Sequence, residues 1–184
     1  MRILKRVVIS FVVILFVLLA LGLLLPREVH VERQIMIDAP AEVVFGLTND
    51  LHQNEKWTPW GRDRDPTIVL VYGGAPAGKG AWYTWESQKL GSGKLEIADS
   101  QSPTSVDMLL TIREGAAPAK VAFKLEPIEG NAKTNVTWSL DTDVGEWPPG
   151  RYFGLFMDKM LGGDFEKGLA NLKAVAEQES VSAK

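Results

Sequence analysis

A long helical stripe near the carboxyl end is the sequence feature that most constrains the fold. Within residues 150–179, apolar side chains recur every three or four positions, which is the spacing of one face of an α-helix. They are Phe153, Met157, Leu161, Phe165, Leu169, Leu172 and Ala176. A helix of about 28 residues would be about 40 Å long at 1.5 Å per residue. Because no short helix could cover such a stripe, we expect it to pack on a broad, curved sheet.

Two consecutive glycines, Gly162 and Gly163, interrupt this stripe without a neighbouring proline. One interpretation is a kink or a break between two helices. The other is a place where backbone or a ligand comes close because no side chain intrudes. The sequence leaves both open.

The sheet is predicted from segments in which apolar and polar residues alternate, the pattern of strands. Two short helices follow the first strand: one begins at Asp38-Ala39-Pro40, with Asp38 as its N-cap, and a helix or turn covers residues 51–57. Glycine-containing turns are predicted at 73–80, 91–93, 114–118 and 129–131. Short connections imply antiparallel neighbours, so the fold class is α+β, with about seven strands around one long helix. The predicted strands are residues 28–37, 67–72, 81–87, 94–98, 105–113, 120–127 and 133–141.

Residues 7–25 form an uncharged apolar run, preceded by Arg2, Lys5 and Arg6. About 20 such residues cross the hydrocarbon core of a bilayer. A cleaved signal peptide has a shorter apolar core and a small-residue cleavage site, which is missing before Pro26, so we favour an uncleaved anchor. The cationic end places the N-terminus in the cytoplasm and the domain outside a single-pass inner (cell) membrane protein. The predicted organisation is 1–6 cationic N-terminus, 7–25 transmembrane anchor, 28–180 ligand-binding domain and 181–184 tail.

Composition excludes several function classes. The net charge is −3 and no basic stripe is present, so we expect no nucleic-acid partner. The chain has no cysteine, which excludes disulfides, thiol catalysis and cysteine metal sites. Two histidines, His30 and His52, are too few for ordinary zinc sites, so no metal and no cofactor are predicted. Residues 73–79 nearly match a phosphate-binding loop, but Gly80 replaces the required Ser or Thr, and we expect no nucleotide.

The order of elements, together with several short motifs, resembles a known superfamily. The motifs are residues 37–43 (Ile-Asp-Ala-Pro-Ala-Glu-Val), Trp57-Thr58-Pro59-Trp60, residues 78–81 (Gly-Lys-Gly-Ala), Trp85 and Gly91-Ser92-Gly93. Over about residues 28–179 the chain resembles the START-like helix-grip superfamily, most closely its bacterial polyketide cyclase/dehydrase branch (SRPBCC proteins). The resemblance implies an antiparallel sheet wrapped around a C-terminal helix, with a cavity for a hydrophobic ligand between them. It implies no single reaction, because members include lipid carriers, cyclases, hydrolases and co-chaperones.

The expected cavity lining comes from the apolar faces of the strands and of the long helix. Trp57 and Trp60 either plug the rim of the core or form an aromatic gate at the mouth of the cavity. The strand aromatics and methionines either fill a solid core or shape a space for a flexible apolar ligand. The predicted lining residues are Trp57, Trp60, Tyr83, Trp85, Met108, Leu110, Phe123, Trp138, Phe153, Met157 and Leu161.

Acid–base chemistry has few candidates. The carboxylates Glu86, Asp107, Asp141 and Asp143 fall opposite the apolar faces or at strand ends, so we interpret them as solvated surface groups. His52 is the one imidazole expected near the cavity rim, as a weak candidate for a general base or ligand contact.

Three functions remain after these exclusions. The first and favoured is a membrane-tethered module that binds a lipid or another hydrophobic small molecule. The second is a cyclase or dehydratase, which would need a buried carboxylate or histidine facing the cavity. The third is a co-chaperone-like protein-interaction domain, which would have an interior filled by its own side chains.

Overall fold

The computed structural model describes residues 2–112 and 118–182, and its architecture is the predicted α+β helix-grip arrangement. The predicted β5–β6 connection at 114–118 and the end of the tail fall largely outside the described residues. The elements are α1 (Arg2–Leu24), β1 (Glu28–Ile37), α2 (Ala41–Asn49), the 3-10 helix η1 (Leu51–Lys56), β2 (Val69–Gly74), β3 (Ala81–Ser87), β4 (Gly91–Gln101), β5 (Ser105–Thr111), β6 (Ala119–Ile128), β7 (Lys133–Asp143) and α3 (Pro148–Ser182).

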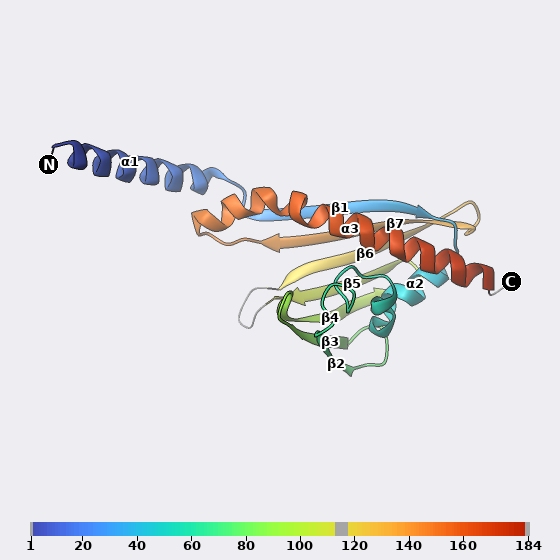
Figure 1. Ribbon diagram of the computed structural model, residues 1–184. Helices are drawn as coiled ribbons and strands as arrows, with labels where there is room; N and C mark the ends of the chain where they lie inside the picture. The colour runs from blue at the N-terminus through green and yellow to red at the C-terminus, as the bar shows by residue number, and fades with distance from the viewer. Residues whose placement is uncertain (1, 113–117, 183–184) are drawn as a thin grey trace.

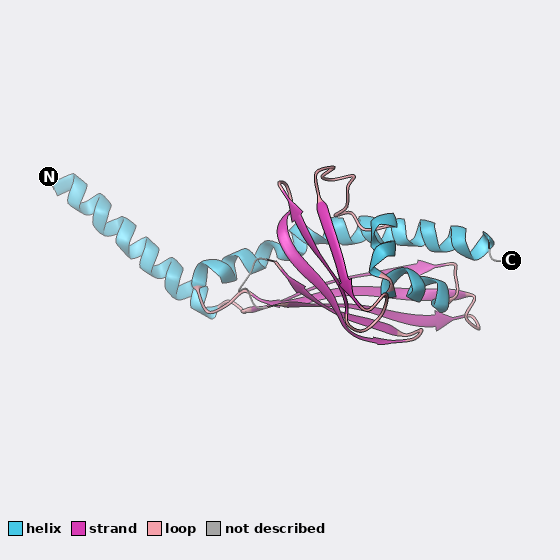
Figure 2. Cartoon of the chain, turned by 90° about the horizontal axis from the view of Figure 1, so that it is seen from below, coloured by secondary structure: helices cyan, strands magenta, loops and turns pink. Residues whose placement is uncertain are grey.

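All seven strands form one antiparallel sheet in the order β1-β7-β6-β5-β4-β3-β2. The sheet is strongly curved, and α3 runs along its β1 side (Figures 1 and 2). The short elements α2 and η1 contact α3 and the sheet near the C-terminal part of α3. Helix α1 extends away from the domain at the opposite end (Figure 1).

Helix α1 is long and apolar enough to cross a bilayer, although a signal sequence near an N-terminus passes the same test. Its large apolar side chains are exposed along nearly the whole helix. They therefore have no partner surface within the described part of this chain, apart from the last turns described below.

The core lies on the concave face of the sheet, where directly paired residues point to the same side. Phe123 pairs with both Val106 and Trp138, and all three side chains are buried. Trp138 stacks between Phe165 of α3, at 4.2 Å between ring centroids, and Phe123, at 5.0 Å. Trp57 meets the faces of Phe123 and Trp138 edge-on at 5.6 Å. These rings hold α3 against the middle of the sheet.

Two local predictions were wrong for tertiary reasons. Strand β4 begins at Gly91, so the predicted turn at 91–93 belongs to the strand; a Cβ on Gly93 would overlap the Trp85 ring, which needs this glycine. Asp38 does not cap α2, which has Pro40 at its N-cap position. Instead the Asn131 side chain, from the β6–β7 turn, accepts a hydrogen bond from the Ala41 N–H at 3.0 Å.

The Gly162-Gly163 pair lies inside a continuous helix, so it does not divide α3 into two helices. The Arg33 guanidinium of β1 lies against Gly162, where a Cβ would overlap it. Arg33 donates hydrogen bonds to Asp158 at 2.8 Å and to Glu166 at 3.0 Å, one turn on either side. The space left by the missing side chain is thus occupied by a side chain of this protein.

Two other glycines of α3 are expected to respond oppositely to alanine. A Cβ at Gly168 would lie 2.7 Å from the buried Trp138 ring, which stacked neighbours hold in place, whereas a Cβ at Gly163 meets open space. Gly163→Ala should stabilise the protein by about 0.5–1 kcal/mol through helix propensity. Gly168→Ala should destabilise the protein, because overpacking costs about 1–3 kcal/mol and this exceeds the gain from helix propensity. Urea unfolding of both variants checks the signs, and a stabilised Gly168→Ala variant would contradict the packing described.

Candidate ligand-binding site

The concave face differs between its two ends. Near α2 and η1 its side chains are fully buried, as in Ile97, Val106 and Val136 at 0% exposure. Near the start of β1, where the chain leaves α1, several remain only half-buried. We call these ends the packed end and the open end. The open end consists of Trp85, Leu110, Met157 and Leu161.

The strand directions explain why these residues share one end of the domain. Trp85 lies near the last residue of β3 and Leu110 near the last residue of β5, and in this antiparallel sheet both strands end on the side at which β1 begins. Met157 and Leu161 lie in the first half of α3, which starts at the same end. The open end is therefore bounded by strands on one side and by α3 on the other.

The packed end is filled by the protein's own rings. Trp57 is 3% exposed, and its Nε1 donates to the Leu47 carbonyl at 3.1 Å. Trp60 is half-buried, and its Nε1 donates to Asp164 at 3.0 Å. Both rings pack on Trp138, so the structure favours a plug in the core over an aromatic gate. Phe123, Trp138 and Met108 are equally part of this core.

Phe153 does not belong to the predicted lining. It is 52% exposed and faces away from the sheet. A helix turns about 100° per residue, so each four-residue step rotates the stripe by about 40°. Three such steps separate Phe153 from Phe165 and turn it about 120° away from the core-facing direction.

Two buried polar atoms of the interior lack a hydrogen-bond partner among the described residues: Trp138 Nε1, a donor, and Asn54 Oδ1, an acceptor. Buried polar atoms are usually satisfied, so each would gain a partner from a bound water or from the polar group of a ligand. Burial raises the pKa of the nearby Tyr83 phenol to about 12, which keeps it a neutral hydrogen-bonding group. Asn54 carried no recognisable signal in the sequence.

The predicted surface carboxylates Glu86, Asp107, Asp141 and Asp143 are all exposed. Asp141 pairs with His30 at 2.7 Å, which raises the pKa of that imidazole.

His52 and Asp65 also lie outside the open end. His52 is exposed, stacks on Tyr72 at 4.2 Å and lies 3.2 Å from Asp50, at the β2 edge of the sheet. The buried carboxylate Asp65 is held in a loop by four hydrogen bonds. In the described part of the chain, no group of three His, Asp or Glu side chains is arranged to hold a metal ion.

Two shallow surface grooves lie elsewhere, between α2, η1 and the last turns of α3. Lys56 and Glu179 line both grooves and form an ion pair at 2.9 Å. The other lining residues are a mixture of polar side chains (Glu42, Gln53, Gln178 and Ser182) and apolar ones (Val43, Leu47 and Val175).

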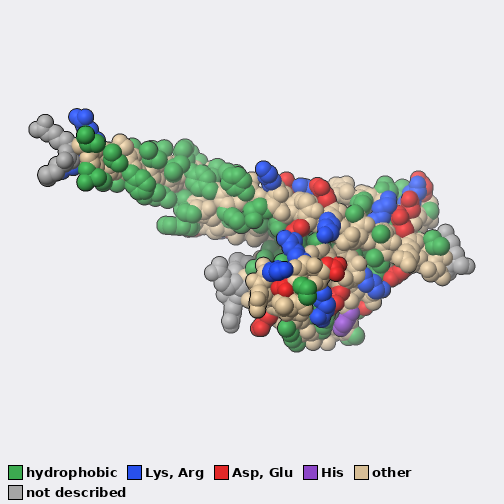
Figure 3. Space-filling view, viewed as in Figure 1, with side chains coloured by type: hydrophobic (Ala, Val, Ile, Leu, Met, Phe, Trp, Pro, Cys, Tyr) green, Lys and Arg blue, Asp and Glu red, His purple; other side chains and the backbone are tan. Residues whose placement is uncertain are grey.

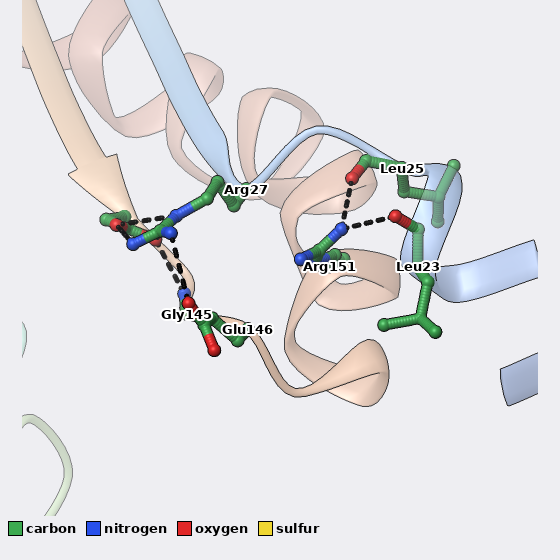
Figure 4. A network of polar contacts seen from close by, with 7 residues as sticks. Leu23, Leu25, Arg27, Gly145, Glu146 and Arg151 are labelled. Atoms are coloured by element: carbon green, nitrogen blue, oxygen red, sulfur yellow. Dashed lines mark hydrogen bonds and ion pairs between the residues drawn. The ribbon is translucent and has the colours of Figure 1, made fainter. Parts of the chain in front are cut away.

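The last turns of α1 are fixed to the start of α3 (Figure 4). The Arg151 guanidinium donates to the carbonyl oxygens of Leu23 and Leu25, at 2.5 and 3.1 Å, and so satisfies groups that a helix end leaves unpaired. The Tyr152 hydroxyl donates to the Leu18 carbonyl at 2.7 Å.

A second contact secures the segment that follows α1 (Figure 4). Arg27 pairs with Asp143 and, at 3.5 Å, with Glu146. Its hydrogen bonds lower the pKa of Asp143.

The sequence matches the model of one protein family. The model described as polyketide cyclase / dehydrase and lipid transport matches residues 28–177. The chain belongs to this family. The match covers the whole sheet and nearly all of α3, and it leaves α1 outside. No curated protein matches the chain significantly.

Solved structures share the fold of this polyketide cyclase/dehydrase family member. A START superfamily protein from Mycobacterium smegmatis is 15% identical, with a TM-score of 0.59 over 82% of this chain and 98% of that chain. The di-domain ARO/CYC BexL from the BE-7585A biosynthetic pathway is 17% identical, with a TM-score of 0.56 over 79% of this chain and 45% of that chain. The Aha1 dimer from Colwellia psychrerythraea is 15% identical, with a TM-score of 0.54 over 81% and 96%. Identities this low show a common fold and nothing finer.

Proposed function

We propose that this protein is a membrane-anchored member of the family that binds a hydrophobic small molecule or lipid at the open end of its concave face. One observation carries the proposal: Ile97, Val106 and Val136 are fully buried at the packed end, yet Trp85, Leu110 and Leu161 stay partly exposed at the open end. Exposed apolar surface on a concave face is typical of a binding site.

The α1 contacts support a retained anchor. Arg151 and Tyr152 of the domain bond to the last turns of α1, and Gly22 lets Pro148 and Tyr152 approach closely. A signal sequence removed on export would have no use for partners built into the mature domain. Together with the cationic N-terminus, this supports an orientation with the N-terminus in the cytoplasm and the domain on the other side of the membrane.

The alternatives lack such an observation. An acid–base enzyme would need a titratable carboxylate or imidazole at the open end, and its residues Trp85, Leu110, Met157 and Leu161 carry none. A protein-interaction domain would need a filled interior, which holds for the packed end alone.

Photo-crosslinking tests the proposal. The full-length protein is placed in lipid nanodiscs that contain a diazirine-bearing lipid, illuminated and digested. We expect label on the peptides that carry Trp85 and Leu110, which belong to strands and not to α1. Leu161→Glu should reduce this label more than tenfold, because burying a carboxylate against an apolar ligand costs well over 1.4 kcal/mol.

Val71→Glu is the matched control, since Val71 is 55% exposed on edge strand β2 and outside the open end. Its label should equal that of the unsubstituted protein. Both variants should have the same unfolding temperature as the unsubstituted protein. Absence of label at Trp85 and Leu110 in the unsubstituted protein would overturn the proposal and favour a protein-interaction domain.

A further inference from the structure

The first turns of α3 expose an unusual amount of apolar surface. Five large side chains, four in these turns and Trp147 just before them, are between 52% and 69% exposed, while Phe165, Leu169, Leu172 and Ala176 further along the helix are buried. Phe153, Phe156 and Met160 fall on one helical face, at steps of three and four residues. We call this surface the α3 apolar patch; it consists of Trp147, Phe153, Leu155, Phe156 and Met160.

The patch is continuous with α1. In the space-filling view the hydrophobic surface of α1 extends onto the start of α3 without a charged boundary (Figure 3). The Tyr152 hydroxyl reaches the Leu18 carbonyl, and Leu18 lies about 9 Å before the end of α1 at 1.5 Å per residue. If α1 spans the bilayer, the start of α3 therefore lies deeper in the membrane than the point at which α1 emerges from it.

Charged residues are also distributed unevenly between the first turns of α3 and the rest of the helix. Between Trp147 and Met157 the one charged residue is Arg151, and its guanidinium is used on the α1 carbonyls. Charges resume at Asp158 and Lys159, where α3 begins to cover the sheet. Water-facing helices carry polar residues on their exposed side, and this stretch does not.

We propose that the α3 apolar patch is a second membrane contact, embedded in the interfacial region of the leaflet on the domain's side. The proposal rests on the membrane anchoring proposed above. Tryptophan and phenylalanine are favoured at this depth, where an apolar ring and a polar edge are both accommodated.

The contact orients the candidate ligand site. Met157 and Leu161 belong to the open end and lie on the same turns of α3 as Phe156 and Met160. Embedding the patch therefore holds the open end at the bilayer surface. A hydrophobic ligand would then pass between bilayer and domain without crossing water.

A bilayer fits the patch better than a second copy of the chain. The patch continues directly into α1 (Figure 3), whose large apolar side chains are exposed along nearly the whole helix. A protein partner seated on the patch would also have to contact α1 within the bilayer.

Depth measurements on the full-length protein in nanodiscs test the proposal. The chain has no cysteine, so single cysteines can be introduced without other changes. A nitroxide label is placed at Phe153→Cys, Phe156→Cys and Met160→Cys, with Val13→Cys in α1 as the deep reference and Val71→Cys as the aqueous reference. The readout is the accessibility of each label to oxygen, which enriches in lipid, relative to a water-soluble nickel chelate.

The labels at positions 153 and 156 should show an oxygen-to-nickel ratio severalfold above that of position 71. Because α3 runs away from α1 (Figures 1 and 2), the depth should decrease from 153 to 160. Aqueous values at 153 and 156 together with a deep Val13→Cys label would overturn this inference and leave the anchor intact. Aqueous values at position 13 as well would overturn the proposed membrane anchor itself. Spin–spin coupling between labels at position 156 of two copies would show that the patch contacts a second copy of the chain and would overturn the bilayer contact.

Discussion

Replacing Phe165 with alanine is expected to lower the free energy of unfolding by about 3–5 kcal/mol. The ring is 1% exposed, stacks on Trp138 at 4.2 Å and joins α3 to the sheet. Its removal leaves a cavity between two elements that cannot both collapse into it. Native domains have only about 5–15 kcal/mol of stability, so the loss should be visible as a large fall in the urea midpoint of the detergent-solubilised protein.

Phe153→Ala is the matched control on the same helix. Phe153 is 52% exposed and contributes little to the core, so its removal should change stability by no more than about 0.5 kcal/mol. Similar losses for the two variants would mean that the first half of α3 is packed as tightly as the second. The division between the core-covering part of α3 and its apolar patch would then be wrong.

Asp65→Asn is expected to lower the unfolding temperature at pH 7 by several degrees. The buried carboxylate accepts hydrogen bonds from Ser87 Oγ at 2.5 Å, from the Thr67 N–H and hydroxyl at 2.9 and 2.7 Å, and from the Lys89 N–H at 3.2 Å. They tie the loop before β2 to the β3–β4 turn. An asparagine amide would turn its own donor toward these donors and leave some of them unpaired.

The pH dependence of this variant gives an independent check. The hydrogen bonds, that from Ser87 foremost, hold the pKa of Asp65 well below its ordinary value. A lowered native pKa stabilises the fold above the unfolded pKa of about 3.9, and that stabilisation is lost as the pH falls. The gap in unfolding temperature between the two proteins should therefore be full at pH 6–7 and narrow toward acid pH. The exposed Asp107→Asn serves as control, and a gap independent of pH would contradict the role given to the carboxylate.

The candidate site shows how far sequence patterns reach. Trp85, Leu110, Met157 and Leu161 were predicted as lining, and the structure leaves them partly buried against the core; whether they bind a ligand stays a prediction. Their alternation placed them on the inward faces of their elements. The same alternation could not separate them from Trp138 or Phe123. Inward-facing residues have the same sequence pattern whether or not a ring from another element packs beside them.

The elements that depend on periodicity within one segment could be predicted from the amino-acid sequence. The apolar run of α1, the alternating strands β1 to β7 and the long helix α3 each carry their pattern locally. The family resemblance, later confirmed over residues 28–177, then fixed the way these elements assemble.

The contacts between distant segments became visible in the folded protein alone. Asn131 rather than Asp38 caps α2, Arg33 rather than a ligand occupies the space at Gly162, and Phe153 faces outward although its spacing matched the stripe. The physical reason is common to all three. A local pattern indicates which side of an element is apolar or lacks a side chain. The residue that packs on that side is determined by the curvature of the sheet and by the rotation of the apolar stripe along α3.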